Sequence, residues 1–313
     1  MKAIVSGYGS IGERHHQILS SFGLFESVDV ISSRASGLNL KSGRAFSCVN
    51  EVNCIEQYSY AVVSSGTSDH LKDYLALRNA NPQSTILIEK PLGCEWEFEG
   101  IEDEKCFVSY NMRFHRGVKE ILSWMKHESV LHADFVVGQN LNQWNRSRHY
   151  SEMYRSSRKL GGGALLDLSH ELDLAVFLFP EMSLRACMIR NSGLHEIDVE
   201  DQVEILAQSG SGGLIRIHMD TLDHGSVRTY RLQGRESTLE CDLLNNKVTI
   251  YTGNEDISNR SWDEPYDHSI ESLHLDLLQN NEGNSVCSLI EALELQKLIA
   301  QCRQMNSVID PGF

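Results

Sequence analysis

Basic residues are scarce in this chain. Its 313 residues include 28 lysines and arginines against 43 aspartates and glutamates, which gives a formal net charge of −15. Because nucleic acid phosphates and anionic membrane surfaces repel such a chain, we expect neither nucleic acid nor a membrane as a partner. The excess of acid does not exclude an anionic substrate, since a local site can still be basic.

Export signals, membrane spans and paired cysteines are missing from the sequence as well. No apolar run approaches the length of a membrane helix. The first apolar strand begins at Ala3, which leaves no room for a signal peptide before it. The eight cysteines form no Cys-x-x-Cys pair, and none lies at zinc-finger spacing from a histidine. We therefore expect a cytoplasmic protein with reduced thiols and no metal site.

The residues that are present fit a globular chain of two domains. Hydrophobic residues make up 41% and charged residues 23% of the chain, which is enough for a buried core. Residues 1–118 alternate short apolar runs with helical patterns, which predicts an α/β domain with a doubly wound parallel sheet, the Rossmann arrangement. The expected strands are Ala3–Ser6, Val28–Ser32, Tyr60–Ser64, Thr85–Glu89 and Cys106–Tyr110, and the expected helices are Ile11–Phe22 and Ser68–Arg78.

A glycine motif follows the first strand directly. Gly7, Gly9 and Gly12 lie between a strand and a helix, the context in which Gly-x-Gly-x-x-Gly binds a dinucleotide. Gly7 permits the tight turn, Gly9 lets the backbone approach a pyrophosphate, and Gly12 lets the helix pack closely on the strand. The N–H groups of Ser10 and Ile11, at the start of the helix, would face the phosphates. The alternative is a turn with a purely structural role.

The end of the second strand bears on the choice of cofactor. Sites that prefer NAD usually place an acid there for the ribose 2′-hydroxyl. Ser33 and Arg34 stand in that region instead, and Asp29 lies too early, inside the strand. A guanidinium matches the oxygens of a 2′-phosphate, so we expect NADP in preference to NAD and assign Ser33 and Arg34 to the cofactor. A solvated Arg34 is the alternative.

Two further strand ends carry polar side chains. We expect Ser64, Ser65 and His70 to face the ribose and nicotinamide, although this segment could also simply cap the next helix. Glu89 and Lys90 leave a buried strand beside the same site. Lys90 could donate a proton to a carbonyl oxygen or polarise it, with Glu89 orienting the lysine. A solvated lysine at a strand end is the alternative.

A glycine-rich loop at 161–163 leads into an apolar helix that carries several titratable groups. At 100° per residue, Asp167, His170 and Glu171 share one face of a continuous helix. Burying such groups is costly unless they are paired or functional, so the pattern favours an acid–base site. A core histidine with satisfied hydrogen bonds is the alternative.

Basic and aromatic residues gather between positions 143 and 159 of this acidic chain. A long loop of this kind commonly contacts substrate. We assign Arg148 and Tyr154 to substrate binding, and the basic side chains of the loop could hold a phosphate or a carboxylate. A solvated loop is the alternative.

Together these motifs resemble the glucose–fructose oxidoreductase and inositol dehydrogenase family (Gfo/Idh/MocA). The resemblance spans nearly the whole chain and rests on the segments Gly7–Gly12, Ser65–His70, Glu89–Pro91, Tyr110–His115 and Gly161–Asp173. It implies that Lys90 and His170 serve the proton transfer. The chain departs from the family in two places: Gly66 replaces the usual proline, and Asp167 lies one residue closer to His170 than usual. Whether Asp167 or Glu171 supports His170 is therefore open.

Residues 119–313 read as an α+β domain for substrate binding and oligomerisation. Consecutive strands without intervening helices predict a largely antiparallel open sheet, followed by a C-terminal helix that could pack back on the first domain. The resemblance implies that helices cover one face of the sheet and that the other joins subunits, so we expect a homodimer or homotetramer. The expected strands are Val130–Leu141, Leu184–Arg190, Gln202–Gln208, Leu214–Thr221, Arg228–Gln233, Thr238–Asp242 and Lys247–Tyr251, and the expected closing helices are Tyr266–Gln279 and Ser285–Gln304.

The combined interpretation is an NAD(P)-dependent oxidoreductase. It would interconvert a secondary alcohol and a ketone on a sugar or nucleotide-linked sugar by hydride transfer. Lys90, His170 and Asp167 would be catalytic, with Asp167 and His170 also binding substrate. Two alternatives stay open: a non-catalytic NAD(P)-binding sensor or regulator, and a reductase of a non-sugar substrate. The presence of both Lys90 and His170 favours the enzyme over the sensor.

Overall fold

The chain forms two compact units, and each is described by itself. Unit 1 comprises Met1–Asn111 and Ser269–Gln296, and unit 2 comprises Met112–His268 and Lys297–Phe313. The computed structural model describes residues 1–95, 97–144, 149–253, 257–279 and 285–309.

This division differs from the one predicted from the sequence, which placed all residues after 118 in one domain. Residues 269–296 join unit 1 because the short strand β15 (Cys287–Ser288) pairs with β6 (Cys106–Val108) at the edge of its sheet. The helix α7 (Leu289–Ile309) begins in unit 1 and ends in unit 2.

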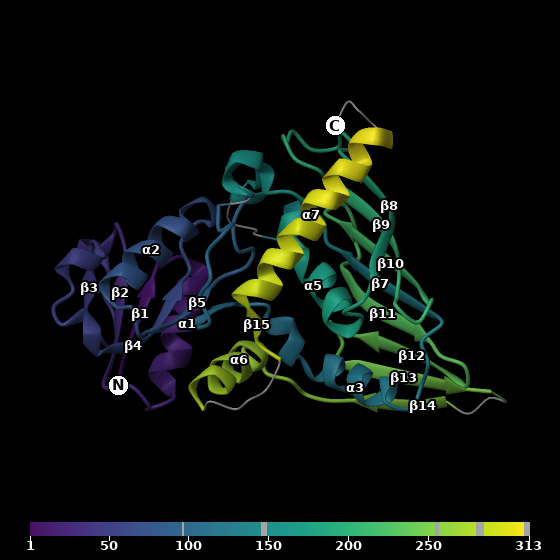
Figure 1. Cartoon of the computed structure of the whole chain (residues 1–313), viewed down its shortest axis with the longest axis horizontal. Helices are drawn as coiled ribbons and strands as arrows, with labels where there is room; N and C mark the ends of the chain where they lie inside the picture. Colours follow the sequence, from purple (N-terminus) through teal and green to yellow (C-terminus); the bar gives the residue numbers. More distant parts are fainter. Residues whose placement is uncertain (96, 145–148, 254–256, 280–284, 310–313) are drawn as a thin grey trace. The chain divides into compact units, whose positions relative to one another are not determined.

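Unit 1 is built on a seven-stranded sheet in the order β15-β6-β5-β4-β1-β2-β3 (Figure 1). All its pairings are parallel except that of β15 with β6. The order 3-2-1-4-5-6 is that of dinucleotide-binding domains and confirms the predicted Rossmann sheet. The remaining strands are β1 (Lys2–Ser6), β2 (Ser27–Ile31), β3 (Ala45–Phe46), β4 (Tyr58–Val63) and β5 (Thr85–Ile88).

Two helices of unit 1 begin close to the carboxyl ends of the strands that precede them. α1 (Ser10–Ser21) starts directly after the glycine turn, and Gly23 follows it with a φ of +66°, as expected of a glycine that ends a helix. α2 (His70–Ala80) follows β4, and α6 (His268–Leu278) comes from the C-terminal part of the chain. Short 3-10 helices lie at Ala35–Gly37, Val49–Glu51, Ile55–Gln57, Thr67–Asp69 and Asn111–Phe114.

Unit 2 is built on an eight-stranded sheet in the order β14-β13-β12-β11-β7-β10-β9-β8 (Figure 1). Only the pairing of β7 with β10 is parallel among those of the described residues. The strands are β7 (His132–Gly138), β8 (Ser183–Arg190), β9 (Gln202–Gln208), β10 (Leu214–Asp220), β11 (Val227–Gln233), β12 (Ser237–Asp242), β13 (Lys247–Thr252) and β14 (Ile257–Ser261). Short 3-10 helices lie at Leu141–Gln143, Tyr150–Glu152, Tyr154–Ser156 and Arg158–Leu160.

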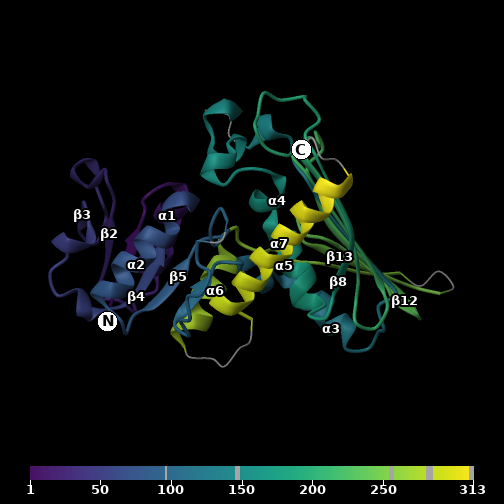
Figure 2. The ribbon, with the colours of Figure 1, turned by 45° about the horizontal axis from the view of Figure 1, so that its top comes forward.

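One face of this sheet is covered and the other is open. Phe135, Ile217 and Tyr230 point to the covered face and are fully buried. There α3 (Arg116–Met125), α5 (Ser169–Leu178) and the C-terminal part of α7 lie against the strands (Figures 1 and 2). No helix of the described residues covers the other face. The predicted, largely antiparallel open sheet is confirmed.

The sequence reasoning missed α3 and the short edge strands β3, β14 and β15. α3 does carry a signal, because Val118, Ile121 and Trp124 recur on one side and are buried. Its first turn is also capped, since the His115 ring accepts a hydrogen bond from Gly117 N at 3.0 Å. β3 and β15 have only two residues each, and β14 is exposed at all five of its residues, so none of the three shows an alternating pattern.

The single helix expected after the glycine loop is two helices. α4 (Ala164–Asp167) ends at Leu168, whose φ of −98° and ψ of 21° interrupt the helix, and α5 then starts at Ser169. The argument that one continuous helix presents Asp167 and His170 on a shared face is therefore wrong, and each residue must be placed by its own contacts.

The sequence predicts no membrane helix and reduced cysteines. In the part of the chain described, no helix has both the length and the apolarity needed to cross a membrane. All eight cysteines are free thiols, and burial covers Cys106, Cys187, Cys241, Cys287 and Cys302.

Candidate functional site

The glycine turn of unit 1 is fixed by close backbone contacts. Gly7 has a φ of +93°, and a Cβ there would overlap the backbone of Ser65. A Cβ on Gly12 would overlap the carbonyl oxygen of Gly7. A Cβ on Gly9 would meet nothing within 4 Å. Gly7 and Gly12 are therefore needed for packing, whereas Gly9 borders the open space that a phosphate group would need.

The start of α1 fits an anionic group. Gly9 is the N-cap residue and supplies no side-chain cap. The first N–H groups of a helix, here those of Ser10, Ile11 and Gly12, lack partners inside the helix and carry partial positive charge. Residues assigned to the phosphates therefore gather around an open backbone turn, the arrangement that a dinucleotide cofactor needs.

Arg34 lies against this turn. Its guanidinium donates a hydrogen bond of 2.6 Å to the carbonyl oxygen of Tyr8, and its side chain is exposed. Ser33 is exposed beside it. Asp29, by contrast, is buried within β2, where it accepts hydrogen bonds from the Tyr58 hydroxyl and from Arg44 N. The carboxylate of the second strand is thus occupied inside the fold.

The side chains of Ser64 and His70 stabilise the turns, whereas the Ser65 hydroxyl does not. The Ser64 hydroxyl donates to the carbonyl oxygen of Gly7 at 2.9 Å. The buried His70 ring faces the carbonyl oxygens of Ser65 at 3.2 Å and Pro91 at 3.1 Å, and burial lowers its pKa. Ser65 Oγ is buried and has no hydrogen-bond partner among the described residues, so it could serve a bound group.

Glu89 and Lys90 follow β5. The Glu89 carboxylate lies 2.9 Å from Nε2 of the fully buried His15, in the interior of unit 1. Lys90 is half-buried. Burial raises the pKa of Glu89, but the hydrogen bond from His15 and, to a smaller extent, the charge of Lys90 lower it overall. Sequence reasoning gave no role to His15, although it lies only three residues after the glycine motif.

In unit 2, two carboxylates of α5 are committed to buried ion pairs. Glu171 accepts hydrogen bonds from Arg228 Nε at 2.7 Å and from the Tyr230 hydroxyl at 3.0 Å, which ties the helix to β11. Asp173 pairs with the buried Arg113 at 2.7 Å. These contacts make Glu171 an anchor of the helix.

Asp167 lies in a different setting, with residues of the preceding loop. It accepts a hydrogen bond of 2.7 Å from the Tyr154 hydroxyl, and Arg155 Nε is 3.1 Å from its other oxygen. The Arg155 guanidinium stacks on the ring of Trp144, 3.6 Å from its centroid. Burial and, after it, the charge of Asp167 raise the pKa of Tyr154. Arg155 and Trp144 are site residues that the sequence analysis did not assign.

The glycine loop explains how these residues are held. A Cβ on Gly162 would overlap the backbone carbonyls of Tyr154 and Arg155, and a Cβ on Gly163 would overlap the carboxylate of Glu200. Glu200 is buried, accepts a hydrogen bond from Leu165 N at 3.1 Å, and has its pKa raised by burial. It thereby caps the start of α4, which carries Asp167.

The sequence also assigns His170 and Arg148 to the site. His170 is a half-buried residue in the first turn of α5. Arg148 lies outside the described residues. Within the described part of the chain, no group of three histidine, cysteine or carboxylate side chains is arranged to hold a metal ion.

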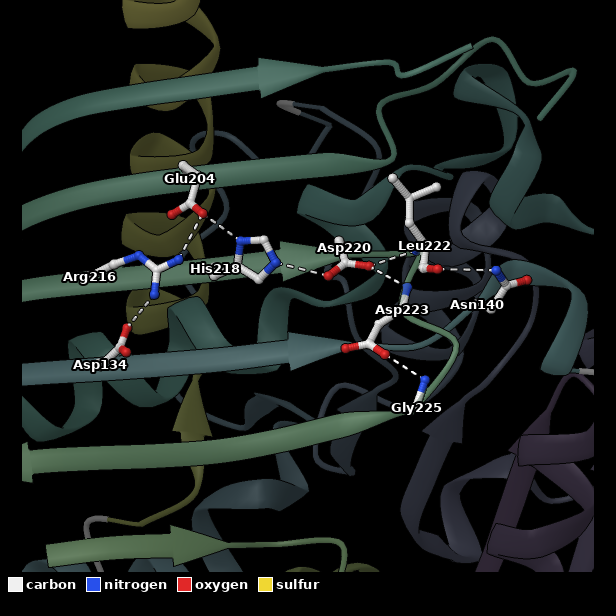
Figure 3. Close-up of polar contacts among 9 residues, drawn as sticks. All are labelled: Asp134, Asn140, Glu204, Arg216, His218, Asp220, Leu222, Asp223 and Gly225. Carbon is white, nitrogen blue, oxygen red and sulfur yellow. Dashed lines mark hydrogen bonds and ion pairs between the residues drawn. The ribbon is translucent and has the colours of Figure 1, made fainter. Parts of the chain in front are cut away.

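A second polar network crosses the open face of the sheet of unit 2 (Figure 3). Arg216 bridges Asp134 at 3.0 Å and Glu204 at 2.9 Å. His218 lies between Glu204 and Asp220, at 2.6 and 2.8 Å. The hydrogen bond to Asp220 is the largest cause of a raised His218 pKa. Sequence reasoning missed this network because its members come from three strands.

Residues 117–240 match a family model described as the GFO/IDH/MocA C-terminal domain. This part of unit 2 is thus similar to the C-terminal domain of the Gfo/Idh/MocA family. The resemblance drawn from the motifs is thereby confirmed. A comparison of the sequence with curated proteins finds no match.

Solved structures with a similar fold cover almost the whole chain. Levoglucosan dehydrogenase in complex with NADH and L-sorbose has a TM-score of 0.80 and 14% identity, over 98% of this chain and 97% of that one. UDP-N-acetylglucosamine 3-dehydrogenase from Acidithiobacillus ferrooxidans has a TM-score of 0.77 and 16% identity, over 98% of both chains. A myo-inositol dehydrogenase from Corynebacterium glutamicum has a TM-score of 0.77 and 17% identity, over 98% of this chain and 97% of that one. At these identities the likeness establishes the fold.

The glycine turn gives a test of stability that needs no ligand. Gly12→Ala should lower the free energy of unfolding by about 1–3 kcal/mol, because the added Cβ overlaps the Gly7 backbone. Gly9→Ala should cost less, at most about 1 kcal/mol, because its Cβ points into open space and only the N-cap preference changes. Urea denaturation of both variants measures the difference, and equal losses would contradict the contact analysis.

Proposed function

We propose that the protein is an NAD(P)-dependent oxidoreductase that interconverts a secondary alcohol and a ketone on a sugar or nucleotide-linked sugar. The observation that carries the proposal is the likeness of 98% of the chain to sugar and polyol dehydrogenases. The open backbone turn at Gly9 and the uncapped start of α1 support a dinucleotide site in unit 1. The cytoplasm is its proposed compartment, as expected for a chain with free cysteines.

NADP is the proposed cofactor, with NAD as the second choice. Arg34 places a guanidinium beside the glycine turn, and Asp29 is occupied inside β2. A 2′-phosphate would gain a charged hydrogen bond from Arg34, whereas an NAD ribose would find no free carboxylate at the strand end. Levoglucosan dehydrogenase and an inositol dehydrogenase homologue from Azotobacter vinelandii were solved with NADH and NAD+, which keeps NAD as the alternative.

Lys90 and His170 are the proposed acid–base residues. When bound, a nicotinamide supplies the acceptor or donor of the hydride. Lys90 and His170 would take up the hydroxyl proton as the alcohol is oxidised and return it when the ketone is reduced. Asp167 is the favoured supporting carboxylate, because Glu171 is already paired with Arg228 and Tyr230. Tyr154, bonded to Asp167, and Arg148 are proposed to contact substrate.

The choice of cofactor predicts a selective loss in one variant. Arg34→Ala should weaken NADPH binding by about 1.5–3 kcal/mol and leave NADH binding nearly unchanged, because only NADPH carries the 2′-phosphate. Fluorescence titration of both reduced cofactors checks this, with Arg44→Ala, another exposed arginine of unit 1, as the control. Tighter binding of NADH by the wild type would sink the preference for NADP.

The assigned chemistry predicts losses of turnover without losses of cofactor binding. Lys90→Met and His170→Ala should each reduce kcat by roughly 10²–10⁴, the usual contribution of a positioned acid or base. The double variant should lose less than the product of the two, since both residues act on one proton. Steady-state kinetics over a panel of sugars and sugar nucleotides, with NADPH titrations alongside, measures both effects. If the variants lost cofactor affinity and kept kcat, the residues would belong to the cofactor site.

We further propose a homodimer or homotetramer joined through the open face of the sheet of unit 2. Met188, Leu206 and Leu214 are 60%, 51% and 59% exposed there. Their charged neighbours are already paired with one another, which lowers the cost of covering the face (Figure 3). Because the face carries both signs of charge, a second copy can complement it.

Light scattering tests the assembly. The wild type should be a dimer or tetramer at micromolar concentration. Leu206→Glu should shift it toward monomer, because a charge would replace an apolar contact, whereas Leu24→Glu, an exposed leucine of unit 1, should not. A monomeric wild type would refute the proposed interface.

A further inference from the structure

A chain of three hydrogen bonds runs through the interior of unit 1 and ends at Glu89. Glu89 Oε1 lies 2.9 Å from His15 Nε2. His15 Nδ1 lies 2.8 Å from His274 Nε2, and His274 Nδ1 lies 2.8 Å from the Tyr60 hydroxyl. The four residues come from distant parts of the sequence: His15 from α1, Tyr60 from β4, Glu89 from the end of β5, and His274 from α6.

With Glu89 ionised and His15 neutral, the donors and acceptors of these hydrogen bonds admit one direction. A carboxylate only accepts, so His15 Nε2–H must donate to Glu89. His15 Nδ1 then accepts from His274 Nε2–H, and His274 Nδ1 accepts from the Tyr60 O–H. In this arrangement each histidine carries its single proton on Nε2. The opposite direction between His15 and Tyr60 requires one more proton, carried by Glu89 or by His15, so the direction of the hydrogen bonds depends on the charge of this pair.

Burial prevents solvent from replacing these bonds. His15 and His274 are fully buried, and Tyr60 is 1% exposed and stacks against Phe25. The row of hydrogen bonds therefore ends inside the protein at Tyr60, where a proton cannot pass to solvent. Its geometry suits the fixing of a charge rather than the conduction of protons to solvent.

We propose that His15, His274 and Tyr60 are positioning residues that hold Glu89 as an oriented carboxylate and so favour the ammonium form of Lys90. The inference rests on the proposed function, in which Lys90 moves the proton. A fixed negative charge beside a lysine stabilises its protonated state, which is the form that donates to a carbonyl oxygen. Truncating any member would leave the next ring nitrogen without its buried partner.

The pKa shifts of Glu89 and His274 have the signs that this arrangement predicts. Burial raises the pKa of Glu89, but the hydrogen bond from His15 and the charge of Lys90 outweigh it and lower the pKa overall. Burial is the largest cause that keeps the pKa of His274 well below its ordinary value, and a positive charge on His15 would lower it further. The titratable groups that face Glu89 are His15 from α1, the adjacent Lys90, and His70 from α2, which interacts with its charge. Since the pKa of Glu89 is lowered, the ionised state is lost only as pH falls through that lowered value.

The experiment measures the charge of Glu89 directly, by carboxyl ¹³C NMR of the full chain across pH, with Glu89→Gln to assign the signal. His15→Leu should raise the titration midpoint of Glu89 by about one unit or more, and Tyr60→Phe should raise it by less, because it removes only the last donor. Tyr58→Phe is the matched control for the tyrosine, since it removes another buried hydroxyl from β4, and His16→Leu is the control for the histidine on α1. Neither control should move Glu89.

Two further readouts distinguish this inference from the proposed function. Long-range ¹H–¹⁵N spectra should show both histidines neutral with the proton on Nε2 between pH 5.5 and 8. The acid limb of the kcat profile should move to higher pH in Tyr60→Phe, with the cofactor Kd unchanged. The proposed positioning role would be overturned by a cationic His15 or His274, or by an unchanged titration midpoint of Glu89 in His15→Leu. Either result would count even if the wild type showed full turnover. A raised titration midpoint of Glu89 in His15→Leu, in a protein that turns over no substrate, would support the positioning role and count against the proposed function.

Discussion

Close backbone contact at two glycine turns is the constraint on which both candidate clusters depend. In unit 1, Gly7 packs on the backbone of Ser65 and Gly12 packs on Gly7, which brings the start of α1 to the ends of β1 and β4. In unit 2, Gly162 packs on the Tyr154–Arg155 turn, which delivers both of those side chains to Asp167. A side chain at these positions would separate the strands or loops that carry the functional groups. Gly9 differs, because the space beside it is open and could hold a phosphate group of a bound cofactor.

The two buried carboxylates of α5 are paired, and the pairing identifies them as anchoring residues. Breaking a buried pair leaves an uncompensated charge, so Glu171 with Arg228 and Asp173 with Arg113 hold α5 in one orientation. With both of its carboxylates committed, the remaining titratable side chain of that helix is His170. The choice between Asp167 and Glu171 as its support could not be made from spacing. The contacts of Glu171 with a strand more than fifty residues away support the proposal that Asp167 has this role.

The sequence predicted the sheets well because half-buried strands leave an alternating pattern, and β9 runs from Gln202 to Gln208 as expected. It predicted the glycine turn because Gly7, Gly9 and Gly12 follow a strand and precede a helix. It failed at Leu168, since nothing in an apolar run marks a helix that stops and restarts. The pairing of His15 with His274 was beyond it, because only the folded chain brings residues 259 positions apart into contact.

Histidines in the two units show how environment decides the charge of one residue type. His274 is enclosed beside another ring, so burial lowers its pKa and it stays neutral. His218 lies between Asp220 and Glu204 on the open face, and these carboxylates raise its pKa (Figure 3). A group whose pKa is raised on folding stabilises the folded state at low pH, and that contribution is lost as pH rises through the raised value. The raised pKa of His218 therefore gives a contribution that is lost as pH rises, whereas the lowered pKa of Asp220 gives one that is lost as pH falls. In the arrangement proposed around Glu89, the hydrogen bonds keep their direction until that carboxylate is protonated.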